Sequence, residues 1–172
     1  MKFVMLFFLL AINASAQSAN LARTSSDQLK IELRANARRV RITDEIVLTV
    51  YFRSPEGEVT IWNALGWGAP AGLYLRVLDP SGHEVPNNFA PFFHPLPPDK
   101  SGKDALIAIG GRSFAGFDSQ IPVKALFPGP GRYLLKCRYL PPLPRDYFRG
   151  QTIWGKEDGL TDSAAVPVSV DE

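Results

Sequence analysis

The sequence predicts an all-β fold in which two antiparallel sheets stack as a sandwich, and three observations support this. Short runs of residues alternate apolar and polar side chains, which is the pattern of half-buried strands. The 15 prolines and 14 glycines fall mainly between these runs, where the chain needs turns. No segment after residue 16 carries the long i, i+3, i+4 apolar repeat of a helix. Because the connections differ greatly in length, a sandwich is favoured over an up-and-down barrel.

The N-terminal residues 1–16 are expected to be a cleaved signal peptide and not part of the fold. A positive start, an uninterrupted apolar run over 3–12 and small side chains over 13–16 match that pattern. The apolar run is too short for a bilayer core, and no later run approaches the length of a membrane-spanning helix. We therefore expect an exported, periplasmic or extracellular protein without a membrane span. Residues 17–26 are then an N-terminal tail, and residues 27–172 form a single domain.

Cysteine usage and charge narrow the class of protein further. Cys137 is the only cysteine, so no disulfide can form within the chain, which favours a bacterial origin over a small eukaryotic secreted domain. Without Lys2, 18 basic side chains face 17 acidic ones. The arginines at 34, 38, 39 and 41 are interpreted as a solvated face. Nucleic-acid binders are usually more basic and carry recognisable motifs, so we expect no nucleic-acid partner.

Five strands are expected in the first half of the domain. Residues 29–34 alternate leucine and isoleucine with polar or charged side chains, and residues 39–42 alternate arginine with valine and isoleucine. Residues 45–53 place an apolar row on one face and end at the turn sequence Ser-Pro-Glu-Gly, which leads into a strand over 58–63. Residues 73–78 alternate again and end at Asp-Pro-Ser-Gly, another turn sequence.

The second half is less regular. Residues 86–98 are too rich in proline for a central strand and form the first long irregular loop. Short strands are expected at 105–109, 121–127 and 132–140. Residues 141–162 form the second long irregular region, and a strand over 164–170, with valines on one face, closes the chain. These runs make about eight or nine strands.

Residues 128–137 resemble the turn and penultimate strand of immunoglobulin-like domains. In that family a turn rich in proline and glycine precedes a tyrosine whose hydroxyl pins the neighbouring backbone, and Tyr133 matches this position. Antibody-type domains carry a cysteine two residues after the tyrosine, whereas Cys137 follows by four and has no partner. The resemblance therefore implies a disulfide-free bacterial immunoglobulin-like or fibronectin type III-like sandwich, with a structural role for Tyr133. Such a fold does not by itself define a function.

The sequence contains no convincing set of catalytic residues. Residues 111–115 echo the Gly-x-Ser-x-Gly motif, but that motif has meaning only where a helix follows, and no helix is expected here. A triad could combine Ser113 with His94 and either Asp99 or Asp118. We expect no enzyme, and a small hydrolase is the least supported alternative. By strand alternation Cys137 should be a buried, inert thiol.

Metal binding finds no support either. The two histidines, His83 and His94, are too few for a structural zinc site. Residues 156–162 lack the order of acidic residues that a calcium loop requires. We therefore expect no metal and no cofactor.

Large aromatic side chains outside the strands are the main candidates for binding. They are Trp67, Phe89, Phe92, Phe93, Tyr147, Phe148 and Trp154, with His94 beside them. Such side chains either cap the core or stand out together as an interaction surface. The second alternative predicts a noncatalytic module that engages a protein or an envelope component through its aromatic and proline-rich loops. A proteinase inhibitor that uses residues 86–98 is the next alternative.

Overall fold

The computed structural model describes residues 28–69, 71–90, 99–100, 104–111 and 113–172. The expected signal peptide at 1–16 lies outside these residues, as does the whole of the expected tail at 17–26. The described part is all-β and holds ten strands, the α-helix α1 and one 3₁₀ turn. The strands are β1 (Lys30–Ala35), β2 (Arg39–Arg41), β3 (Glu45–Arg53), β4 (Val59–Trp62), β5 (Leu73–Leu78), β6 (Leu106–Ile109), β7 (Phe114–Pro122), β8 (Gly131–Tyr139), β9 (Thr161–Asp162) and β10 (Val166–Asp171). The helix α1 spans Val123–Leu126, and the 3₁₀ turn spans Lys156–Asp158.

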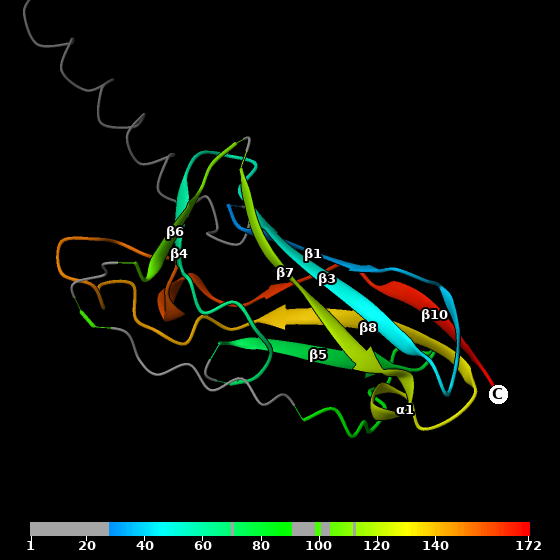
Figure 1. Ribbon diagram of the computed structural model, residues 1–172. Coiled ribbons are helices and arrows are strands. Elements are labelled where there is room, and N and C mark those ends of the chain that lie inside the picture. The colour runs from blue at the N-terminus through cyan, green and yellow to red at the C-terminus, as the bar shows by residue number, and fades with distance from the viewer. Residues whose placement is uncertain (1–27, 70, 91–98, 101–103, 112) are drawn as a thin grey trace, which may run out of the picture.

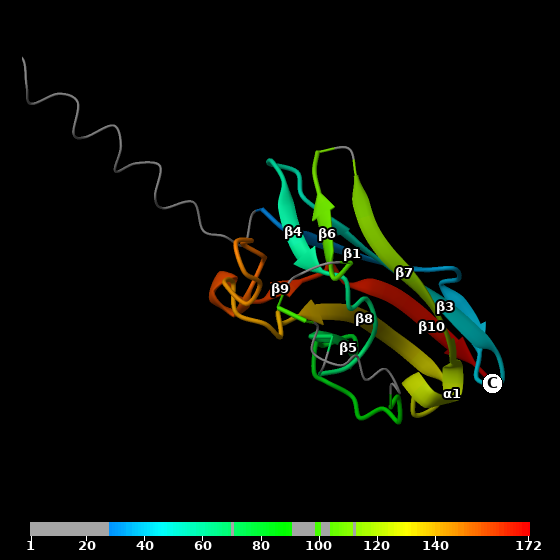
Figure 2. The same ribbon diagram turned by 60° about the vertical axis from the view of Figure 1, so that its left-hand side comes forward.

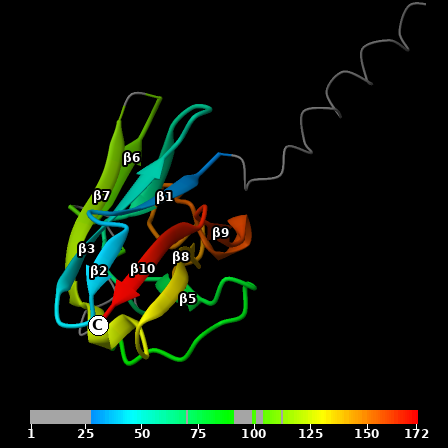
Figure 3. The same ribbon diagram turned by 90° about the vertical axis from the view of Figure 1, so that its right-hand side faces the viewer.

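Most strands belong to two sheets that stack face to face (Figures 1 and 3). The first sheet has the order β1-β3-β7. The second has the order β2-β10-β8-β5, with β9 paired to β8. The strands β4 and β6 pair with each other as a separate ribbon at one end (Figure 2). All pairings are antiparallel except that of β2 with β10, which is parallel.

The core lies between the two sheets and follows from the alternation in their strands. In β3 every second side chain from Ile46 to Phe52 is buried, and in β8 the same holds from Leu135 to Tyr139. Phe52 and Tyr139 meet across the layers with ring centroids 5.2 Å apart in an edge-to-face arrangement. Burying one such side chain is worth roughly 1.5–3 kcal/mol, so these rows fix which face of each strand points inward.

The strand predicted at 121–127 is wrong. The strand at this place is β7, which begins at Phe114 and pairs along its whole length with β3, and the chain then enters α1. Pro122 directly precedes the helix, where a residue without an amide hydrogen costs no hydrogen bond. The residues after it bury Val123 and Leu126, a spacing of three that suits one helical turn, and the Phe127 amide donates to the Val123 carbonyl at 3.0 Å. The short strand β9 was not expected from the sequence.

No helix within the described residues has the length and apolar character needed to cross a membrane.

Candidate functional site

Three of the aromatic candidates from the loops are core residues. Trp67, Phe148 and Trp154 are all buried. Trp67 and Trp154 belong to the main core, whereas Phe148 packs with Trp62 and Ile153 in a second cluster. For these side chains the structure supports the core-capping alternative, because each large ring removes much apolar surface from water when it folds inward.

The other candidates for binding are either half-buried or lie outside the described residues. Tyr147 is half-buried and packs edge to face on Phe148, with ring centroids 5.1 Å apart. Phe89 is also half-buried. Phe92, Phe93 and His94 lie outside the described residues, as does most of the loop at 86–98 on which the inhibitor alternative rests.

An open groove of about 540 Å³ lies beside β7 and contains two of the predicted residues. Trp67 and Phe89 form one wall, with their ring centroids 6.1 Å apart. Phe117 of β7 meets Trp67 edge to face at 5.5 Å. Ser119 lines the groove next to Phe117 on the inward face of the same strand. The groove therefore combines aromatic walls with a hydroxyl, a composition typical of ligand sites.

The position of the groove follows from the edge of the first sheet. β7 is the last strand in the order β1-β3-β7, so one of its edges has no strand partner among the described residues. The loop that carries Phe89 is tied to α1, because the backbone amide of Asn88 donates to the Ala125 carbonyl at 2.9 Å. Asn88 and Gln120 are exposed and also line the groove, and the Gln120 side-chain amide donates to the Glu45 carboxylate.

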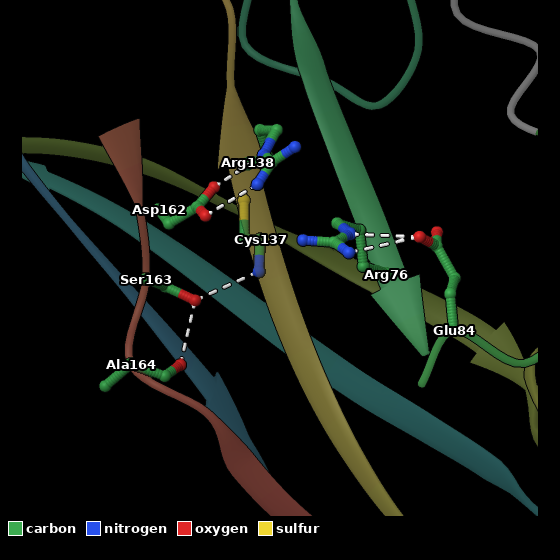
Figure 4. Close-up of polar contacts among 7 residues, drawn as sticks. All are labelled: Arg76, Glu84, Cys137, Arg138, Asp162, Ser163 and Ala164. Carbon is green, nitrogen blue, oxygen red and sulfur yellow. Dashed lines mark hydrogen bonds and ion pairs between the residues drawn. The ribbon is translucent and has the colours of Figure 1, made fainter. Parts of the chain in front are cut away.

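Tyr133 and Cys137 occupy structural positions on β8. The Tyr133 hydroxyl donates to the Gly129 carbonyl at 3.0 Å and so ties the strand to the turn before it. Cys137 is a buried free thiol, and its backbone amide donates to the Ser163 hydroxyl at 2.9 Å (Figure 4). Burial raises the pKa of this thiol far above its usual range, so the reactive thiolate is disfavoured.

Two of the side chains weighed for a hydrolase, Ser113 and Asp118, are engaged in separate local contacts. The Ser113 hydroxyl accepts from the Gly110 amide at 2.8 Å within the turn between β6 and β7. Asp118 accepts from the Thr49 hydroxyl at 2.6 Å on the outer face of the first sheet. His83 lies in an exposed turn with Ser81 and Asp79. Within the described ranges, no cluster of three His, Cys, Asp or Glu side chains is arranged to hold a metal ion.

Two exposed features were missed by reasoning from the sequence. Phe114 is 59% exposed on the first sheet, where it meets Tyr51 edge to face at 5.2 Å. The Arg34 guanidinium lies over the Tyr51 ring, 5.1 Å from its centre. The second feature, on the outer face of the second sheet, contains Tyr74, Leu140 and Leu160. In both cases the signal in the sequence is weak, because single exposed apolar residues are common.

A scan against protein-family models and a search of curated proteins found no match to this chain.

Proposed function

We propose that this protein is an exported, noncatalytic binding module of the immunoglobulin-like type, whose groove beside β7 takes an extended segment of a partner protein. The observation that carries the proposal is the combination of an aromatic groove with a strand edge that has no partner in the described residues. Exposed strand edges accept an additional strand through backbone hydrogen bonds, and pockets beside them select its alternate side chains.

The strand order supports the immunoglobulin-like assignment. In such sandwiches the strands A, B and E share one sheet, and C, F and G share the other. Here β1-β3-β7 and β5-β8-β10 follow that division in chain order, and the ribbon of β4 and β6 is an addition to it. Tyr133 stands near the start of β8, which takes the place of strand F in this correspondence, and its hydroxyl contacts the backbone four residues upstream. That contact resembles the tyrosine corner of immunoglobulin-like domains and so supports the proposal.

The dimensions of the groove favour a short apolar segment as the ligand. A volume of about 540 Å³ lies within the range of ligand pockets and accommodates one or two large side chains. Trp67 is buried, and its indole N–H finds no acceptor among the described residues. Charged side chains are absent from the groove lining in the described part of the chain, so the segment is expected to be uncharged where it enters.

The test is a selection of short peptides from a random phage-displayed library on the immobilised protein. Enriched peptides should alternate apolar residues and lose affinity by about tenfold or more when Ser119→Arg fills the groove. Asp118→Arg is the matched control, because it places the same side chain one position along β7 on the outer face of the sheet. Peptides that bind both variants equally, or no enrichment at all, would contradict the proposal.

A further inference from the structure

The outer face of the second sheet carries a cluster of exposed apolar side chains. Four large hydrophobic side chains are exposed within the described residues, and three of them belong to this sheet or its immediate border. Tyr74 of β5 is 36% exposed, Leu140 directly after β8 is 42% exposed, and Leu160 directly before β9 is 48% exposed. Single exposed apolar residues are common on protein surfaces, whereas several that lie together can mark an interaction site.

The strand register brings these three side chains to one place. Tyr74 pairs with Arg138 of β8, and Arg138 pairs with Asp162 of β9. Leu140 lies two residues after Arg138, and its amide continues the ladder by donating to the Gly72 carbonyl at 2.6 Å. Leu160 lies two residues before Asp162. Because neighbouring strands are about 4.8 Å apart and alternate residues share a face, all three side chains lie around Arg138.

Ion pairs hold the arginines of this cluster in fixed positions (Figure 4). Arg138 binds Asp162 through two hydrogen bonds of 2.7 and 2.8 Å. Arg76 of β5 binds Glu84 at 3.1 Å. Two-point contacts of this kind orient a guanidinium group, so less side-chain freedom is lost when a further partner binds.

Lys136 gives the cluster its surplus of positive charge. It pairs with Arg76 in the strand register, and none of the ion pairs within the described ranges includes it. The three cations Arg76, Lys136 and Arg138 thus face the two carboxylates Glu84 and Asp162. Arg132 extends the positive surface further along β8.

We propose that the Tyr74 patch, formed by Tyr74, Arg76, Lys136, Arg138, Leu140 and Leu160, is a second docking surface for a partner protein with an apolar centre and an acidic rim. Tyrosine and arginine are enriched among the residues that dominate protein interfaces, and an apolar centre with a polar rim is their usual layout. A second copy of the patch would bring like charges together. The carboxylates Glu84 and Asp162 disfavour a surface of densely spaced phosphates.

The experiment selects short random peptides on the intact protein at low salt and then measures the affinity of the enriched peptides for variants. The proposal expects peptides that combine apolar residues with Asp or Glu. Their affinity should fall about tenfold or more for Lys136→Glu and for Leu160→Ser, and it should fall with added salt. Lys124→Glu and Phe114→Ser are matched controls, because both original side chains are exposed and lie outside the second sheet, on α1 and on β7 of the first sheet.

Several outcomes would overturn the proposal. One is a selection that yields no acidic peptides; another is a set of acidic peptides that bind the Lys136→Glu variant as well as the original protein. Cosedimentation with phosphatidylglycerol vesicles that Lys136→Glu abolishes, in the absence of peptide binding, would assign the patch to a membrane surface. A dimer in sedimentation velocity that Leu160→Ser dissociates would assign it to self-association. Ser119→Arg serves to separate this surface from the groove, because patch-binding peptides should tolerate that change.

Discussion

Gly72 offers a test of how tightly β5 and the end of β8 are fitted together. Its φ is +74°, in the left-handed region that disfavours side chains, and its carbonyl accepts the Leu140 amide at 2.6 Å. A Cβ atom at this position would lie 2.0 Å from the Leu140 carbonyl oxygen and 2.9 Å from the Pro142 ring. Gly72→Ala therefore combines a strained backbone with a clash against another backbone segment.

The two costs can be separated with other glycines. Gly57 has a φ of +93°, and a Cβ atom added there would meet nothing within 4 Å, so Gly57→Ala should cost only the left-handed term of about 1–2 kcal/mol. Gly116 has no left-handed φ, but its Cβ would lie 2.3 Å from the Val50 carbonyl oxygen, so Gly116→Ala should cost about 1–3 kcal/mol for overpacking. Gly72→Ala combines both terms and should cost about 2–5 kcal/mol.

Urea unfolding followed by tryptophan fluorescence would measure these costs, since the three tryptophans Trp62, Trp67 and Trp154 are buried. For a chain of this size the free energy lost in Gly72→Ala corresponds to a fall in Tm of roughly 4–20 °C. If Gly57→Ala and Gly72→Ala lowered the free energy of unfolding equally, the contact between Gly72 and Leu140 would not be tight. Leu140 would then not be held at its place in the Tyr74 patch, because its position depends on this contact.

Further measurements test other parts of the structure. Burial raises the pKa values of Cys137 and Tyr139 above their ordinary values of 9.0 and 10.0, so their contribution to stability is complete at neutral pH and lost as the pH rises beyond about 9. Unfolding free energies measured from pH 7 upward should show this decline, and Cys137→Ala should make it shallower; an unchanged slope would contradict a buried thiol. The hydrogen bonds from Arg138, together with its charge, lower the pKa of Asp162, so the stabilisation from this pair is present at neutral pH and lost as the pH falls below about 4. Asp162→Asn should therefore cost about 0.2–1 kcal/mol at pH 7 and progressively less as the pH falls below about 4 in the same urea assay, and a cost independent of pH would refute the ion pair. Asp158 is buried and accepts the Gly155 amide at 2.8 Å, so Asp158→Ala should cost about 1–3 kcal/mol in thermal unfolding, whereas the exposed neighbour Glu157→Gln should cost less.

The strands with one buried face could be predicted from the sequence. In β3 the apolar side chains recur at every second position, and only one choice of inward face buries all of them. The region around Pro122 could not be predicted in the same way. Its apolar residues Ile121, Val123 and Leu126 fit either a strand or a helical turn, and the pairing of β7 with β3 decided between them.

The candidate site could be predicted less well than the strands, because its shape depends on how side chains from different strands pack. Trp67 and Phe89 stand out in the sequence as aromatic residues between strands, but that pattern is the same for a buried and an exposed ring. Contact with Phe117 buries Trp67 and leaves the groove beside it. Tyr74, Leu140 and Leu160 carry no such signal, because each is a single apolar residue whose exposure depends on its neighbours in space.

The order of apolar and polar residues, together with proline and glycine between the runs, determined that this chain forms antiparallel sheets with Tyr133 and Cys137 on the inner face of β8. That information is local, because a side chain two positions away lies on the same face whatever the strand pairs with. The tertiary structure decided which strands became neighbours, and with them the groove beside β7 and the Tyr74 patch. Both surfaces join residues far apart in the sequence, so the register that aligns them arises only when the sheets pack.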